Sequence, residues 1–225
     1  MPAVLEGHLK AFSKGRTVFD PSPPELSNFT FANHDWDNLY VGSEEAIDPD
    51  QPKPLNEKEL EILLFVDASN GSDKDTMKSV TSYHVLLGQT VVQTYSKRQN
   101  TIETSTYGSE LVASKIAVEA ALAMRQKLRM LGIKVSKPTT ILCDNQSVVY
   151  NMTLPSSTLK KKHHLLSWNK CREAVAIEAV RFAHIGSKWN QADLGTKAVG
   201  PVDCYRLLRA PMFGKLNTGV DEIQE

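Results

Sequence analysis

The sequence lacks the features that mark membrane-spanning, secreted and disulfide-stabilised proteins. Its 225 residues include three cysteines, and no two of them have the C-x-x-C spacing of a zinc or redox motif. No apolar run approaches the roughly 18 residues that a transmembrane helix needs. The N-terminal segment lacks the apolar stretch of a secretory signal. We therefore expect an intracellular protein of a reducing compartment, with no membrane partner.

The chain also has no net charge of either sign, because 26 basic side chains balance 26 acidic ones. The balance conceals an uneven distribution, since residues 57–200 carry six more bases than acids and both flanking segments are acidic. A basic body suggests an anionic partner, although an ordinary solvated surface explains the same count. With 41% apolar and 23% charged residues, the composition is that of a globular domain.

Prolines divide the chain into parts. Six of the 11 prolines lie between Pro21 and Pro54, which disfavours regular structure there. We interpret residues 1–56 as a linker or an extended arm, residues 57–200 as the folded domain, and residues 201–225 as a C-terminal tail. Aromatic side chains in the arm predict that part of it packs on a neighbouring surface.

Hydrophobic periodicity in the domain predicts alternating strands and helices. We expect strands at 61–69, 82–88, 90–96, 139–145 and 179–186. We expect helices at 106–131, 147–152, 158–178 and 190–199, with a weaker helical pattern at 202–208. Because a strand hairpin is followed by helix–strand alternation, the order predicts an α/β fold with a five-stranded mixed sheet flanked by helices.

Four carboxylates occupy positions where α/β proteins gather ligand-binding groups. They lie near the ends of predicted strands or the beginnings of predicted helices: Asp67, Glu110, Asp144 and Asp193. Taken singly, such an acid has an ordinary explanation as a paired, capping or dipole-stabilising group. Taken together at one sheet edge, they would repel strongly unless divalent metal neutralised them. Oxygen ligands suit Mg²⁺ or Mn²⁺, and a cationic surface around such a pocket suits a nuclease.

Five motifs follow one another in the order and spacing of a known enzyme family. They are FVDAS (65–69), SKRQNTIETSTYGSELVA (96–113), CDNQSVV (143–149), LKKKHHLLSWNKCREA (159–174) and NQADLGTK (190–197). Residues 60–200 thereby resemble a copia-type ribonuclease H, the domain that follows the reverse transcriptase in the Pol polyprotein of copia-like LTR retrotransposons. The resemblance implies an RNase H-like fold and hydrolysis of the RNA strand of RNA/DNA hybrids.

The upstream segment resembles another part of the same polyprotein. The stretch GHLKAFSKGRTVFDPSPP looks like the tail of the reverse-transcriptase region, so we interpret residues 1–56 as a remnant of that connection with its Pro- and acid-rich linker. The sequence lacks a YxDD polymerase motif, an integrase segment and an aspartic-protease DTG. We therefore expect a fragment or a degraded copy of a longer Pol, with the reverse transcriptase and other Pol segments as partners.

The resemblance implies catalytic roles for individual residues. The family's metal-binding acids fall on Asp67, Glu110, Asp144 and Asp193, which are implied to hold two Mg²⁺ ions, with Mn²⁺ as a substitute. The implied mechanism uses metal-activated water to attack the RNA phosphate, leaving 5′-phosphate and 3′-hydroxyl ends. His163 matches a Lys-His position of the family, and it is expected either near the site or as a support of its helix.

The resemblance also implies contacts to the hybrid. The residues expected to make them are Asn145, Gln146, Ser105, Thr106, Ser109, Lys160, Lys161 and Lys162. The two amides stand where the family contacts the minor groove and can bond the 2′-hydroxyl of RNA. The hydroxyl residues have helix capping as an alternative role, and the lysines have that of a solvated charge run.

One departure from the family and two alternatives stay open. Gly195 stands where a larger apolar residue is usual, and glycine costs roughly 1 kcal/mol inside a helix, so the rigidity of the last predicted helix is in question. A catalytically decayed module that binds nucleic acid or another Pol segment is the first alternative. An integrase-like nuclease is the second, but it needs three acids with a late glutamate, against which the early Glu110 and the fourth acid Asp193 argue.

Overall fold

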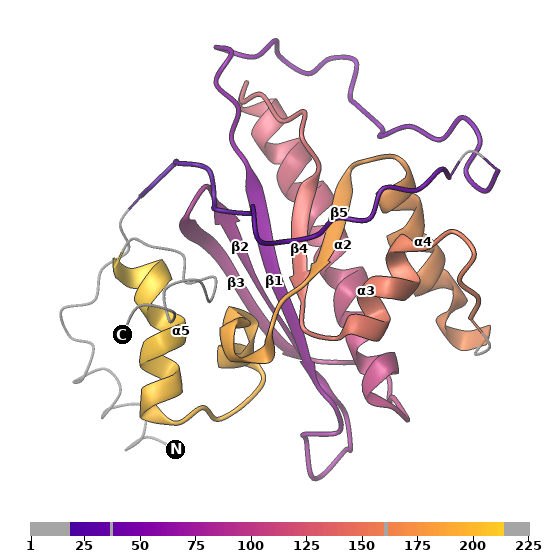
Figure 1. The fold of residues 1–225 in the computed structure, drawn as a ribbon, viewed down its shortest axis with the longest axis vertical. Coiled ribbons are helices and arrows are strands. Elements are labelled where there is room, and N and C mark those ends of the chain that lie inside the picture. The colour runs from indigo at the N-terminus through magenta and orange to yellow at the C-terminus, as the bar shows by residue number, and fades with distance from the viewer. Residues whose placement is uncertain (1–18, 37, 160–161, 214–225) are drawn as a thin grey trace.

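A mixed β-sheet runs through the centre of the fold (Figure 1). The computed structural model describes residues 19–36, 38–159 and 162–213, and within them five strands pair in the order β3-β2-β1-β4-β5. The strands are β1 (Ile62–Ser69), β2 (Val80–Leu87), β3 (Thr90–Arg98), β4 (Thr139–Cys143) and β5 (Val180–His184). β1, β2 and β3 are antiparallel, whereas β4 and β5 run parallel to β1. The predicted five-stranded mixed sheet with flanking helices is confirmed.

Helices follow the sheet strands in the expected order. The longer ones are α2 (Thr106–Met130), α3 (Gln146–Thr153), α4 (Leu165–Ala176) and α5 (Pro201–Phe213). Three short 3₁₀ helices connect them: η1 (Lys162–His164), η2 (Ser187–Trp189) and η3 (Gln191–Gly195). Among the described residues, no helix is long and apolar enough to cross a membrane.

Two of the predicted helices are shorter than their sequence patterns. The helix expected at 158–178 is α-helical from Leu165 to Ala176, after the short 3₁₀ turn η1. Arg172 donates hydrogen bonds to the carbonyls of Leu154 and Pro155 at 2.9 and 2.6 Å, so tertiary contacts shape this stretch. The helix expected at 190–199 is the short η3, which ends at Gly195.

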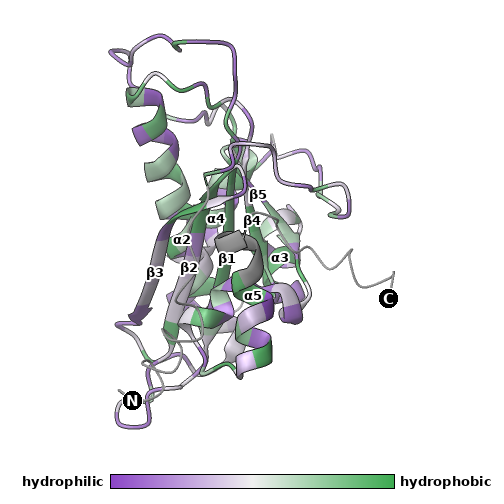
Figure 2. Ribbon diagram, turned by 90° about the vertical axis from the view of Figure 1, so that its left-hand side faces the viewer, coloured by the Kyte–Doolittle hydropathy of each residue, from purple (hydrophilic) through white to green (hydrophobic). Residues whose placement is uncertain are grey.

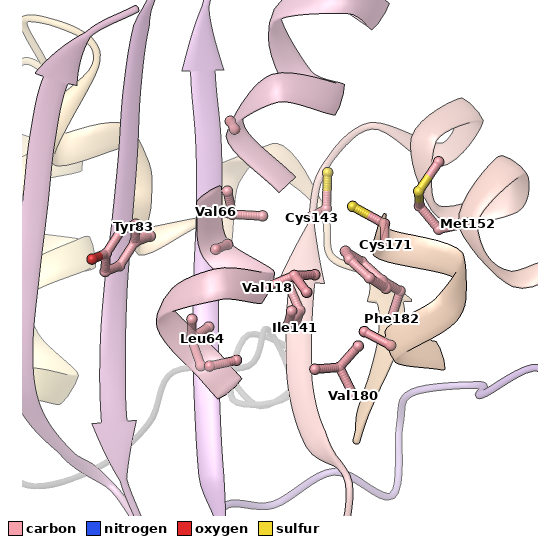
Figure 3. Packing of buried hydrophobic residues seen from close by; sticks show 14 of the residues in the cluster. Leu64, Val66, Tyr83, Val118, Ile141, Cys143, Met152, Cys171, Val180 and Phe182 are labelled. Carbon is pink, nitrogen blue, oxygen red and sulfur yellow. The ribbon is translucent and has the colours of Figure 1, made fainter. Parts of the chain in front are cut away.

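The larger hydrophobic core lies between the sheet and α2, α3 and α4. Figure 3 shows Val66, Ile141 and Phe182 of three strands beside Val118 of α2 and Cys171 of α4. These five side chains are at most 1% exposed, and each contributes roughly 1.5–3 kcal/mol by leaving water. In Figure 2 the middle of the sheet shows green, the colour of hydrophobic residues, whereas β3 ends in a purple, hydrophilic arrowhead. This core therefore fixes α2 against the strands.

The N-terminal arm, residues 19–56, covers the opposite face of the sheet. Leu63 and Phe65 of β1 belong to a second cluster, against which the partly buried Phe29 and Phe31 of the arm pack. The guanidinium of Arg181 on β5 lies 3.9 Å from the centroid of the Phe31 ring. Figure 1 shows the arm crossing the sheet on the side away from α2. The predicted packing of the arm's aromatic residues is thus confirmed.

An ionic cluster fastens the later part of the arm to α2. Glu45 accepts hydrogen bonds of 2.7 and 2.8 Å from the guanidinium groups of Arg125 and Arg129. Arg125 is 1% exposed, so its charge depends on this partner. Burial by itself raises the pKa of Glu45, but the bonds from both arginines outweigh it and lower the pKa to about 2.

We expect Glu45→Gln to reduce the free energy of unfolding near neutral pH by roughly 2–4 kcal/mol, because it leaves a buried arginine without its counter-charge. The native pKa lies below the ordinary value of 4.5, so this stabilisation is fully present above that pH. It is lost as the pH falls toward about 2. Urea unfolding of both proteins at neutral and acidic pH measures the difference and its decline.

Glu57→Gln is the matched control for this experiment. Glu57 pairs with Lys134 at 2.6 Å, but its side chain is 93% exposed, so its loss is expected to leave the stability nearly unchanged. Equal losses in the two variants would contradict the role of the ionic cluster.

Candidate active site

The parallel pairing of β1 with β4 brings two of the predicted acids to one edge of the sheet. Val66 is level with Cys143 in the register, so the residues that follow, Asp67 and Asp144, lie side by side. Asp67 is 1% exposed, and Asp144 comes directly after the last residue of β4. Two adjacent carboxylates are therefore held by the hydrogen bonding of the sheet itself.

The other two acids reach this edge from elements on either side of it. Glu110 lies near the beginning of α2, and Asp193 lies in η3, which packs against β1 and β2. Carboxylate oxygens of Asp67, Asp144 and Asp193 lie within 4.8 Å of one another. An oxygen of Glu110 lies within the same distance of one from Asp144. The structure thus brings together all four predicted acids, which we call the acid cluster.

Burial and mutual repulsion raise the pKa values within the acid cluster. Burial raises the pKa of Glu110 to about 9, and the negative charges of Asp67 and Asp144 add to the effect. Burial likewise raises the pKa of Asp193 to about 6, against the hydrogen bond from Lys197. The pKa of Asp144 is raised by burial and by Asp67. Burial is thus the main reason that these carboxyl groups hold their protons more tightly than exposed ones do.

Two further residues, which the sequence did not identify, complete the acid cluster. The ammonium nitrogen of Lys197 lies 2.8 Å from Oδ1 of Asp193 and 3.5 Å from Oδ2 of Asp67. The hydroxyl of Thr196 donates a short hydrogen bond to Asp67. The spacing of Asp193 and Lys197 by four residues is a signal for the first contact. The bond of Thr196 links distant parts of the chain, and no local pattern reveals it.

The donor set fits hard divalent cations. Oε2 of Glu110 is buried and accepts no hydrogen bond from any described residue, which leaves it available as a ligand. Among the described residues, Lys197 is the cation that pairs with these acids, so divalent ions would let all four carboxyl groups be ionised together. Carboxylate oxygen is the ligand that Mg²⁺ and Mn²⁺ prefer. The residues present therefore fit the ions that the resemblance implies.

A cleft of about 520 Å³ opens over the acid cluster and reaches three of the residues expected to contact the hybrid. Thr106, Asn145 and Gln146 line it, and the first and last of these are exposed. The side-chain oxygen of Asn145 accepts hydrogen bonds from the amides that follow it and so caps α3. This cap fixes the side chain of Asn145 at the rim of the cleft.

Two other residues that were expected to contact the hybrid use their hydroxyl groups in hydrogen bonds at the start of α2. The side chain of Ser105 accepts a 3.2 Å hydrogen bond from the amide of Gly108, so the capping alternative is confirmed for this residue. Ser109 is fully buried, and its hydroxyl donates to the carbonyl of Thr106 at 2.9 Å. Neither hydroxyl faces the cleft over the acids.

His163 and the described part of the lysine run do not line the cleft over the acid cluster. Lys160 and Lys161 fall outside the described residues, whereas Lys162 is exposed in η1. The structure does not bring His163 together with the four acids. Its side chain groups with Glu103 and His164 and lines a second cleft.

The glycine in η3 permits a close approach to the sheet. A Cβ atom at Gly195 would lie 2.9 Å from the Cβ of Ser82 and closer still to its hydroxyl. The hydroxyl of Ser96 donates a 2.6 Å hydrogen bond to the carbonyl of Gly195. The glycine that shortens the helix thus lets η3 rest on β2 and β3. This close packing gives a reason for a glycine in the segment that carries Asp193, whose rigidity stays a prediction.

We expect Gly195→Ala to lower the free energy of unfolding by roughly 1–3 kcal/mol, because the added methyl group has no space against Ser82. The same change is expected to weaken Mn²⁺ binding, since it displaces Asp193. Thermal unfolding and calorimetric Mn²⁺ titration measure the two effects. Gly200→Ala is the control, because a Cβ at Gly200 meets nothing within 4 Å. Equal behaviour of the two variants would show that η3 is not fixed by this contact.

Comparison with curated proteins identifies relatives among transposon polyproteins. The retrovirus-related Pol polyproteins from transposons RE1 and RE2 of Arabidopsis thaliana are both 28% identical to this chain, over 138 and 143 residues. These matches cover 61% and 64% of the chain but 9% and 10% of the relatives, so the chain spans about a tenth of their length. No family model matches. The similarity to transposon Pol polyproteins that the motifs predict is confirmed.

The solved structures that are similar include ribonuclease H domains. The N-terminal RNase H domain of Rv2228c from Mycobacterium tuberculosis is 13% identical with a TM-score of 0.47, covering 61% of this chain and 91% of that one. RNase H1 from Halobacterium salinarum is 14% identical with a TM-score of 0.46, covering 60% and 94%. LC11-RNase H1, solved with an RNA/DNA hybrid, is 15% identical with a TM-score of 0.48 over the same shares.

Proposed function

We propose that this chain is a metal-dependent endonuclease that hydrolyses the RNA strand of RNA/DNA hybrids, as the ribonuclease H part of a copia-type retrotransposon Pol. The observation that carries the proposal is the acid cluster, in which oxygens of Asp67, Asp144 and Asp193 lie within 4.8 Å and Glu110 stands beside them. Burying several carboxylates together costs free energy that the contacts of Lys197 and Thr196 return only in part, which supports a functional reason for the arrangement.

The chain's own residues hold and orient the reactive centre. The hydrogen bond from Thr196 fixes the carboxylate of Asp67, and the register of β1 and β4 fixes Asp144 beside it. Lys197 offsets part of the repulsion within the cluster. Two Mg²⁺ ions, or Mn²⁺ in their place, would be held by the four acids and would supply Lewis-acid chemistry that activates water and neutralises phosphate charge.

The proposed substrate contacts surround the same cleft. Gln146 and Asn145 lie at its rim, where amide groups can bond the 2′-hydroxyl that distinguishes RNA from DNA. Thr106 is placed to contact phosphate or sugar, and Lys162 with its two preceding lysines would contact phosphate further along. Ser105 and Ser109 are left out because their hydroxyls are engaged in the helix. The proposed partners are the hybrid and the reverse-transcriptase segments of Pol.

Cleavage of an end-labelled RNA/DNA hybrid in the presence of Mg²⁺ or Mn²⁺ tests the proposal. We expect Asp67→Asn and Asp144→Asn each to abolish cleavage of the RNA strand, because each removes a charged metal ligand. Binding of the hybrid is expected to persist, because neither change removes a phosphate-contacting base. EDTA is expected to abolish cleavage by the unaltered protein, and added metal to restore it.

Asp75→Asn is the matched control, since it makes the same chemical change at an exposed acid between β1 and β2. This variant is expected to cleave as the unaltered protein does. Continued cleavage by Asp144→Asn would disprove the assignment of the acids. A folded, unaltered protein that binds the hybrid and does not cut it would instead favour the catalytically decayed binding module.

A further inference from the structure

A second group of metal-ligating side chains lies apart from the acid cluster. It consists of Glu103, on the loop that leads into α2, with His163 and His164 of η1, and we call it the histidine cluster. One ligand atom from each residue lies within 4.8 Å of the other two. All three residues line a cleft of about 780 Å³, which Lys97 and Arg98 also line.

The distance between the two buried members matches that between ligands of a tetrahedral metal. Nε2 of His164 lies 3.2 Å from Oε2 of Glu103. Zinc bonds to nitrogen and oxygen of about 2.0–2.2 Å, arranged tetrahedrally, place neighbouring ligand atoms about 3.4 Å apart. The ring of His163 lies 4.0 Å from that of His164 between centroids, and its exposed side chain has room to turn toward the pair.

The surrounding protein is shaped to hold this pair. Glu103 is 8% exposed and His164 is 2% exposed. The hydroxyl of Thr101 donates a 2.9 Å hydrogen bond to Oε1 of Glu103, which leaves Oε2 directed at the histidine. A Cβ atom at Gly108 would lie 2.8 Å from Oε2 of Glu103 and 2.9 Å from Nε2 of His164, so only a glycine in α2 leaves these two atoms their space. Outer-shell support of this kind is typical of metal ligands.

We propose that Glu103, His163 and His164 bind one Zn²⁺ ion or a similar transition-metal ion, with its fourth position open to the cleft. Imidazole nitrogen favours zinc over magnesium, so this ion differs in kind from those proposed for the acid cluster. Two neutral imidazoles and one carboxylate leave the bound ion with a positive charge. Lys97 and Arg98, the latter paired with Asp73, line the same cleft, so the open position suits water or an oxygen of an anionic group such as phosphate. This site is independent of the proposed cleavage reaction.

Competition between the full-length protein and a chromophoric zinc chelator tests the proposal. The titration uses Asp144→Asn as the parent protein, so that zinc bound at the acid cluster is reduced. We expect one Zn²⁺ per chain, bound at least about tenfold more weakly after His163→Ala or Glu103→Gln. His163 is exposed, so its replacement leaves the core intact, and Glu103→Gln provides a second variant of nearly unchanged volume.

Cobalt substitution provides a readout that reports the geometry directly. Four-coordinate Co²⁺ absorbs strongly in the visible range, and we expect this absorption in the parent protein and its loss in His163→Ala. His34→Ala is the matched control, because His34 is an exposed histidine on the arm. The proposal is overturned if the parent binds no Zn²⁺, or if His163→Ala keeps both the absorption and the affinity. Neither result depends on whether the acid cluster cleaves RNA.

Discussion

The repulsion among four carboxylates at the ends of β1 and β4 is the constraint around which the structure is arranged. Parallel pairing of these strands forces Asp67 and Asp144 together, while α2 and η3 add Glu110 and Asp193 from either side. Lys197 and Thr196 contact the acids, but burial and the neighbouring carboxylates still raise the pKa values of Glu110 and Asp193. Such a cluster persists because packing elsewhere holds its elements in place, which leaves divalent cations as its natural complement.

That packing is supplied from both faces of the sheet. On one face, α2 is fixed by the larger core and by the ionic bonds between Glu45 and its two arginines. On the other face, η3 rests against β2 and β3 where Gly195 permits close approach. The two elements that carry Glu110 and Asp193 are therefore positioned independently. The geometry of the acid cluster therefore depends on packing against both faces of the sheet.

Sequence patterns predicted much of this architecture but not the contacts between residues that are distant in sequence. Strand periodicity and the alanine-rich pattern of α2 gave the order of elements, because both are local and repeated. The four acids were found because each stands beside a predicted element boundary. The bond of Thr196 to Asp67 and the close packing of Gly195 on Ser82 could not be predicted, because they depend on partners distant in sequence. Helix propensity indicated only that a glycine weakens a helix, and it gave no sign of the close packing of Gly195 on the sheet.

The arm that crosses the sheet also affects the solubility of the protein. Phe29 and Phe31 cover Leu63 and Phe65, which would otherwise present an apolar surface to water. A proteolytic cut that releases the arm would leave the acids in place and yet convert the protein into one that self-associates. Such a protein would lose solubility before it lost the arrangement of its acids. Phe29 and Phe31 would thus serve the protein as core residues do, although they lie in a segment that looks like a linker.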